Sequence, residues 1–201
     1  GLLRFDSDLV HILDVVGPEV QRAVALLAAR RACEAAGLTD VPWVARALSA
    51  SGEGRPLPPP FDDPARLAET LRSDPRVPDT SVLGATPPER PPYRPPTADT
   101  AHEVAVLHPG VTPYTPGRIS QPHFALPAVL AAAEPAPLIA ALDAVWHALQ
   151  THGEHYPQLL DEIRSVCTER VGGIEAALRV RTTPPRLIDV TAVVPRLAPL
   201  A

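Results

Sequence analysis

The chain has 201 residues, of which 45% are hydrophobic and 4% aromatic, and its formal net charge is −5. This length allows a substantial core, and the scarcity of aromatic residues favours packed helices with a core of Leu, Val and Ala. The acidic balance disfavours nucleic acid as a partner, and the lack of a run of about 18 apolar residues predicts no membrane span.

All 18 basic residues are arginines, and the chain contains no Lys, Asn or Met, a usage typical of a high-GC genome such as an actinobacterial one. The absence of Lys excludes a P-loop lysine, a Schiff base and attached pyridoxal phosphate in this chain. The leading Gly1 and the missing Met suggest that the natural start is absent. We expect a cytoplasmic protein without a cofactor, in which Cys33 and Cys167 are buried free thiols.

The first 74 residues predict a series of helices. Asp6 or Ser7 can cap a first helix that closes near residue 17, although a buried strand fits the same short apolar run. Further along, Thr39 or Asp40 is expected to cap a helix that ends at Gly52. An Asp-Asp-Pro sequence is expected to begin another helix, which runs to about residue 73.

The clearest helix runs from Gly17 to Gly37, because Pro18 suits its first turn and Gly37 suits the position after its last residue. Arg31 returns to its apolar face, so we expect either that this end of the helix leaves the core or that Arg31 pairs with an acid. Expected partners are Glu34, Asp40 or an acid of the proline-rich region. The predicted apolar face consists of Val20, Val24, Leu27, Ala28 and Ala35.

Eighteen of the 27 prolines lie between Pro56 and Pro127. The densest part, residues 84–127, contains TPPERPPYRPP, which is incompatible with a helix or a central strand. A disordered linker and an ordered extended strap both fit this composition, and the apolar residues it retains favour the strap. Within the strap, residues 101–108 alternate in polarity and predict a strand.

Helical sequence resumes near Leu126. Two helices, one from Pro137 to Leu149 and one over 157–171, are predicted to form an antiparallel hairpin across a connector at 151–157. Asp161 and Glu162 are expected on the solvated face of the second helix. The predicted buried stripe of the first helix consists of Leu138, Leu142, Val145 and Leu149.

Gly172 and Gly173 are expected to end that second helix. Residues 174–181 fit a strand or a helix, and residues 187–194 are the best strand in the chain, so a small antiparallel β element is expected near the C-terminus. The sequence therefore predicts a mainly α fold: a bundle-like single domain with a proline-rich strap. Its expected sub-regions are N-terminal helices (1–74), the strap (75–127), and a helical hairpin with a β hairpin (128–201).

Six of the seven histidines lie between residues 102 and 155. The tightest group suggests a metal site with His147, His152, Glu154 and His155 as ligands, because imidazole and carboxylate suit zinc, iron or manganese. A solvated connector explains the same residues, and the chain has no HExxH pattern. A second group is typical of a polar edge strand and consists of His102, Glu103, His108 and His123.

A candidate interaction surface combines a basic helix end with the proline-rich strap. Polyproline II segments are preformed ligands for aromatic-lined grooves, although an inert connector has the same composition. The candidate interaction residues are Arg30, Arg31, Pro91, Pro92, Tyr93 and Arg94.

Two functions fit the sequence. The better supported is a soluble, non-enzymatic helical interaction or accessory protein whose partner is another protein. The alternative is an enzyme or small-ligand-binding protein with its site under the strap and His-dependent metal binding. No G-x-S-x-G motif surrounds any serine, which gives nucleophilic catalysis no support.

Overall fold

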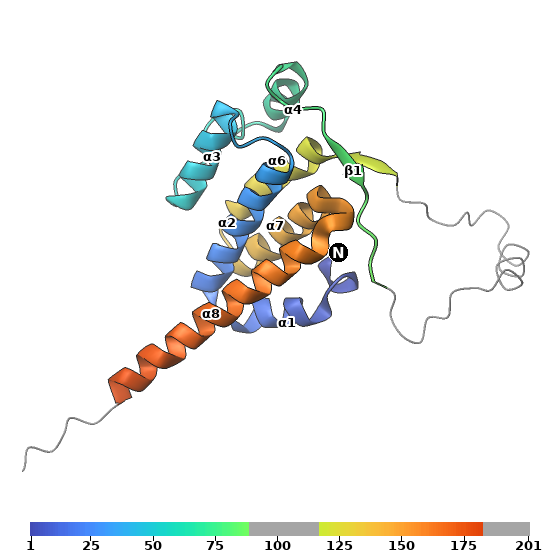
Figure 1. Ribbon diagram of the computed structural model, residues 1–201. Coiled ribbons are helices and arrows are strands. Elements are labelled where there is room, and N and C mark those ends of the chain that lie inside the picture. Colours follow the sequence, from blue (N-terminus) through green and yellow to red (C-terminus); the bar gives the residue numbers. More distant parts are fainter. Residues whose placement is uncertain (89–116, 183–201) are drawn as a thin grey trace, which may run out of the picture.

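A computed structural model describes residues 1–88 and 117–182 of the chain (Figure 1). These residues are mainly helical and include one two-stranded antiparallel sheet, so the predicted mainly α class is confirmed. The elements in chain order are η1 (Leu2–Arg4), α1 (Ser7–Val15), α2 (Pro18–Ala35), α3 (Pro42–Gly52), α4 (Pro64–Ser73), β1 (Ser81–Leu83), β2 (Arg118–Ser120), α6 (Gln121–Ala132), α7 (Pro137–His152), η2 (Gly153–His155) and α8 (Tyr156–Thr182).

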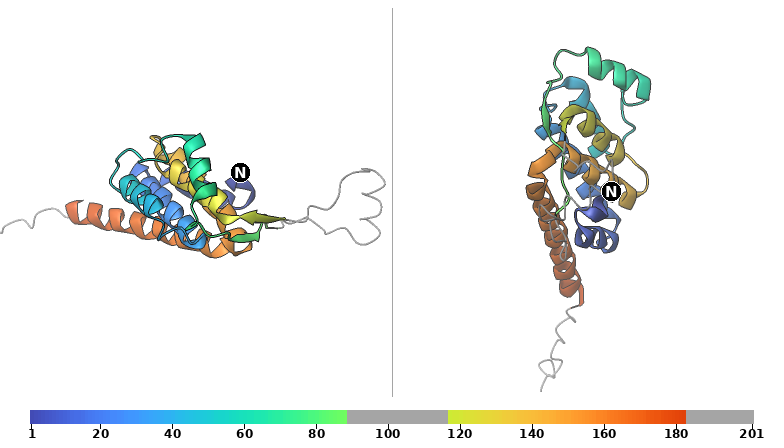
Figure 2. Two further views of the ribbon diagram at one scale, coloured as in Figure 1. Left: turned by 90° about the horizontal axis from the view of Figure 1, so that it is seen from above. Right: turned by 90° about the vertical axis from the view of Figure 1, so that its right-hand side faces the viewer.

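Helix α2 lies at the centre of this arrangement. It has Pro18 in its first turn, ends at Ala35, and is followed by Gly37 at φ = 69°, as its sequence predicts. It packs against α7, α6, α8 and α3, and Figures 1 and 2 show it lying among these helices. The helix that is clearest in the sequence is therefore in contact with four other α-helices.

The buried face of α2 is built largely from small side chains. The predicted face is confirmed at Val20, Val24 and Ala28, which are buried. Leu27 also packs against the core but is only partly buried, as is Ala35. A methyl side chain lets two helix backbones approach closely, so larger side chains lie at the edges of the contact. The alanines of this face are at most 1% exposed and are Ala25, Ala28, Ala29 and Ala32.

Helices α6 and α7 present the same kind of surface to α2. The predicted stripe of α7 is confirmed at Val145 and Leu149, whereas Leu138 and Leu142 are only partly buried. The larger side chains thus surround an alanine-rich centre, in which interior atoms are closely packed. The fully buried alanines of these two helices are Ala125, Ala128, Ala140, Ala141, Ala144 and Ala148.

Carboxylate caps begin two of the shorter helices. The side chain of Asp6 accepts a backbone hydrogen bond at 2.9 Å from the first turn of α1, so the predicted cap is confirmed and the alternative strand is wrong. Helix α4 begins at the Asp-Asp-Pro sequence, as predicted, and Asp63 is its cap. Neither Thr39 nor Asp40 caps α3, because its N-cap is Val41. The residue before a proline is held in an extended conformation, which fixes the start of this helix at the Pro that follows.

The proline-rich region is described only at its ends. Residues 89–116 lie outside the described ranges, and the predicted strand 101–108 lies there with them. The predicted end of the strap is wrong, because α6 already begins at Gln121. Pro122 occupies the first turn of α6, where a backbone N–H has no partner within the helix, so proline causes no loss there. Pro127 lies inside the helix.

The β element lies in the middle of the sequence. Strand β1 pairs antiparallel with β2, with Val82 opposite Ile119. Residues 174–181 belong to α8, so Gly172 and Gly173 do not end that helix and the predicted C-terminal β hairpin is wrong in its first strand. Helix-forming Ala, Leu, Glu and Arg around the glycine pair explain the continuation. The second predicted strand, 187–194, lies outside the described residues.

The sheet rests on Gly153, which follows the last residue of α7. Gly153 is buried and has φ = 55° and ψ = −126°, a conformation that side chains strongly disfavour. A Cβ atom there would lie 2.1 Å from the Leu83 carbonyl oxygen and 2.7 Å from the Val82 Cγ1 atom. The absence of a side chain at this position is therefore what allows β1 to approach the junction between α7 and α8.

Replacing Gly153 by Ala is expected to destabilise the protein more than replacing Gly17 by Ala. Gly17 also has a conformation disfavoured by side chains, with φ = 84° and ψ = 166°, but no atom lies within 4 Å of a Cβ built there. The difference between the two free energies of unfolding should be about 1–3 kcal/mol, the penalty of overpacking. Equal losses in urea denaturation would show that β1 does not rest on this glycine.

Candidate functional site

The four predicted metal ligands lie at the end of α7 and in η2. His147 is half-buried on α7, and its Nδ1 atom has no hydrogen-bond partner among the described residues. His152 is the last residue of α7, and its Nδ1 donates to the Ala148 carbonyl at 2.9 Å. Glu154 and His155 are exposed in η2. The predicted connector therefore begins two residues later than expected, because α7 includes His152.

Burial lowers the pKa of both histidines on α7. Desolvation is the leading cause for His147, opposed by the charge of Asp143. Desolvation also dominates for His152, and its hydrogen bond to Ala148 opposes it. Neutral imidazole is thus favoured at both positions in the folded protein.

The described residues contain no group of three or more His, Cys, Asp or Glu side chains placed to hold a metal ion. Within the second histidine group, His123 bonds through its Nδ1 to the Ser120 hydroxyl at 2.8 Å. The other three members, His102, Glu103 and His108, lie outside the described ranges. The geometry thus lends the metal hypothesis no support.

The two cysteines are buried free thiols, as expected. Desolvation raises the pKa of Cys33 to about 12, and burial also raises the pKa of Cys167. A thiol with a raised pKa is protonated at neutral pH and is a weak nucleophile. These positions therefore serve packing, in keeping with their place in the core.

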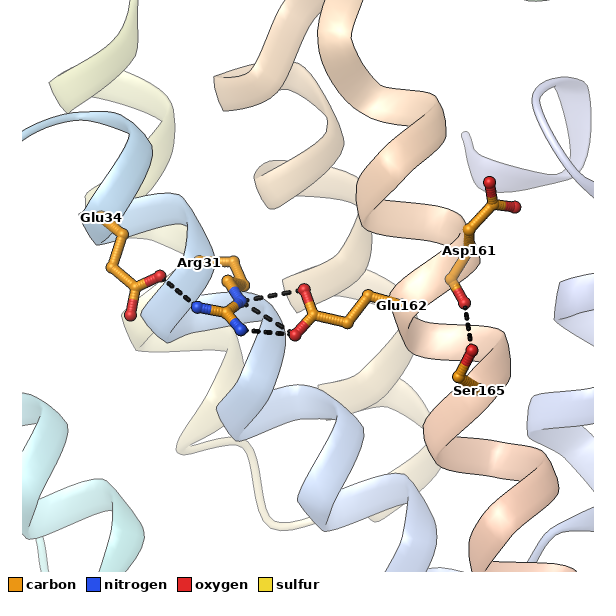
Figure 3. Close-up of polar contacts among 5 residues, drawn as sticks. All are labelled: Arg31, Glu34, Asp161, Glu162 and Ser165. Carbon is orange, nitrogen blue, oxygen red and sulfur yellow. Dashed lines mark hydrogen bonds and ion pairs between the residues drawn. The ribbon is translucent and has the colours of Figure 1, made fainter.

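Arg31 joins α2 to α8 through a bridge with two glutamates (Figure 3). Its Nε atom lies 3.0 and 2.9 Å from the two carboxylate oxygens of Glu162, and its Nη1 lies 2.5 Å from Glu34 Oε2. The hydrogen bonds to Glu162 and then to Glu34 raise the pKa of Arg31. The predicted pairing of Arg31 with Glu34 is confirmed. Glu162 was expected on a solvated face of its helix, but its carboxylate pairs with Arg31.

A second arginine bridge holds α8 to the start of α1. Arg164 donates to the Oδ2 atom of Asp6, and it also contacts Asp161 at 3.1 Å. The other carboxylate oxygen of Asp6 caps α1, and the residue is buried at 7% exposure. Arg31 from α2 and Arg164 from α8 therefore both help to hold α8 against the rest of the fold. The interaction role predicted for Arg31 stays a prediction.

An open pocket of about 450 Å³ lies where α2, the end of α3 and the turn between α6 and α7 meet. Its walls combine arginine with apolar side chains, and none of the described residues that line it is acidic. We call it the arginine pocket, and its main lining residues are Arg22, Leu26, Ser51, Arg55, Leu57 and Pro135.

The two arginines that line this pocket, Arg22 and Arg55, have different hydrogen-bond partners. Arg22 donates through Nη1 and Nη2 to the carbonyls of Glu134 and Pro135, just after the end of α6. Arg55 donates through Nε to Glu53 at 2.7 Å, and its two terminal nitrogens bond to no other described residue. The Ser51 hydroxyl is buried and likewise has no hydrogen-bond partner in the described part of the chain.

Arg30 lies close to the same pocket. Arg22, Leu26 and Arg30 are spaced four residues apart, which places them on one side of α2. A Cβ atom added to Gly52 would lie 3.6 Å from the Arg30 Nη2 atom, so this guanidinium reaches the end of α3. Arg30, predicted as an interaction residue, is thus exposed beside the arginine pocket. The other predicted interaction residues, Pro91, Pro92, Tyr93 and Arg94, lie outside the described ranges.

Comparisons with protein-family models, curated proteins and solved structures found no match. In the described ranges, no helix combines the length and the apolar character that a transmembrane span requires. The arginine pocket is therefore interpreted from its own residues.

Replacing Arg31 by Met and Glu162 by Gln, singly and together, is expected to reveal a coupling energy of about 0.5–1 kcal/mol in urea denaturation. The value is modest because both side chains are partly exposed, at 39% and 36%. Arg30→Met is the matched control, since Arg30 pairs with no carboxylate in the described ranges. A coupling near zero, or an equal loss in the control, would mean that the bridge does not help to hold α8.

The free energy of unfolding is expected to fall as the pH drops below about 6.5, the ordinary pKa of histidine. The unfolded chain then takes up protons that the partly buried His147 and His152 resist in the folded state, which favours unfolding. Each histidine contributes at most about 1.4 kcal/mol per pH unit. Denaturation of His147→Gln/His152→Gln at pH 7.5 and 5.5 should show a smaller difference than the parent protein. An unchanged difference would assign the pH effect to other groups.

Proposed function

We propose that this protein is a non-enzymatic interaction protein whose arginine pocket binds an acidic segment of another protein. The observation that carries this proposal is the pocket itself, which is lined by Arg22 and Arg55 together with Leu26 and Leu57 and by no acidic residue from the described part of the chain. Guanidinium groups bind carboxylates through paired, charge-assisted hydrogen bonds. The apolar wall gives the side chains next to such a carboxylate a surface on which to pack.

The available donors support an incoming acid. The terminal nitrogens of Arg55 are uncommitted within the described residues, and Arg30 lies exposed beside the pocket. Arg22 is already held by two carbonyls, so it contributes charge at a fixed position. Glu53 neutralises part of this charge through its ion pair with Arg55, and an incoming carboxylate would share that guanidinium.

A protein segment fits better than an enclosed small molecule. The rim residues Gly54, Arg55 and Pro56 are exposed, and so are Ala133 and Pro135 on the opposite side. Sites for small molecules usually bury most of the ligand surface, whereas this pocket leaves its occupant open to solvent on one side. The formal net charge of −5 disfavours nucleic acid, whose binding requires a broadly basic surface.

The proposal is tested with an array of 12-residue peptides in which every acidic peptide has a twin carrying Gln and Asn in place of Glu and Asp. Binding is expected for a subset of the acidic peptides and is expected to be lost in their twins. Arg30→Gln and Arg55→Gln should each weaken binding about tenfold, the effect of losing a hydrogen bond to a charged group.

Arg46→Gln is the matched control, because Arg46 is an exposed arginine on α3 outside the pocket lining. Equal binding by acidic peptides and their twins would overturn the proposal, as would equal losses in all three arginine variants. Tighter binding to single-stranded DNA of matched charge than to any peptide would assign the pocket to nucleic acid instead.

A further inference from the structure

A second open pocket, of about 460 Å³, lies between the end of α4, the turn that follows it and the start of α6. It lies at the opposite end of α6 from the arginine pocket. The 12 residues of α6 separate the two pockets by about 18 Å at 1.5 Å per residue. Apolar side chains form much of its wall, among them Leu71, Val77, Pro78 and Pro122.

Four charged or titratable residues line this second pocket: Arg72, Asp74, Asp79 and His123. Two of them are neutralised by neighbours. Arg72 pairs with Glu69 at 2.8 Å. Asp74 accepts hydrogen bonds from Arg76 Nη2 at 2.8 Å and from Trp43 Nε1 at 2.9 Å, and these partners, Arg76 first, hold the pKa of Asp74 well below its usual range.

Asp79 differs from its neighbours. It is exposed, and its carboxylate makes no hydrogen bond or ion pair with any residue of the described ranges. His123 uses its Nδ1 atom in the bond to Ser120, which leaves Nε2 as a further polar group at the pocket. Among the described lining residues, Asp79 is therefore the charge that lacks a compensating partner.

We infer that this second pocket, the Asp79 pocket, binds the guanidinium group of an arginine side chain supplied by another protein. A pocket lined by an unpaired carboxylate and apolar side chains is complementary to such a side chain, whose charged end would pair with Asp79 while its methylene groups pack on Leu71 and Val77. This site has the opposite charge preference from the arginine pocket, and it does not depend on the function proposed for that pocket.

The inference is tested with two short peptides, acetyl-Gly-Arg-Gly-amide and the same peptide with citrulline in place of arginine. Citrulline keeps the shape of the side chain and removes its charge. Titration of the isotope-labelled full chain, followed by amide chemical shifts, is expected to show the arginine peptide binding at the Asp79 pocket about threefold to tenfold more tightly than the citrulline peptide. Asp79→Asn should abolish this preference.

Asp40→Asn is the control, because it removes an exposed carboxylate outside the pocket lining and should leave the preference intact. Arg55→Gln should also leave it intact, which separates this result from a failure of the arginine pocket. Equal binding of the two peptides, or a preference that survives Asp79→Asn, would overturn the inference. Methylguanidinium, a free guanidinium compound with the same single charge as the arginine peptide, is the third probe, and tighter binding of methylguanidinium than of the arginine peptide would overturn the assignment to a protein side chain.

Discussion

The close packing of small side chains between α2, α6 and α7 is the constraint on which the rest of the fold depends. Each buried alanine removes little apolar surface from water, so its burial contributes less than that of a leucine. A row of alanines nevertheless brings helix backbones close together, and dispersion contacts then accumulate along the whole interface. This arrangement suits a chain with few aromatic residues and no Met. The larger fully buried side chains of α6 and α7 are apolar, among them Leu126 and Leu149.

Long polar side chains consequently act at the edges of the helices. Arg31 and Arg164 attach α8 to α2 and α1 through carboxylates, and Arg22 reaches the carbonyls that follow α6. In each case the aliphatic part of the arginine can lie along the helix surface while its guanidinium reaches a neighbouring element. Since arginine supplies every permanent side-chain cation in this chain, the same residue type both fastens the helices and provides the charge at the arginine pocket.

Local signals in the sequence predicted much of the helical structure. Proline in the first turn, glycine after the end and aspartate at the cap identified α2, α1 and α4, because these residues act on the backbone within one turn. The buried faces were harder to predict. Periodicity gives most weight to large side chains, so Leu27 was expected inside, whereas the contact with α6 and α7 selects alanine. Glu162 was assigned to solvent because its partner, Arg31, lies 131 residues away in the sequence.

Neither pocket follows from a local pattern. The arginine pocket joins α2, the end of α3 and the turn before α7, and the Asp79 pocket joins α4 to the start of α6. Two residues at these pockets were singled out beforehand: Arg30, through its place at the basic end of α2, and His123, as a member of the second histidine group. The two pockets nevertheless share a cause. Helix α6 is buried along one side by α2 and α7, and the chain turns at both of its ends, where packing leaves open space. Because that buried side holds α6 in place, the spacing of the two pockets is a property of the helical core. Their opposite charge depends also on Arg55 and Asp79, which lie in the loops that line them.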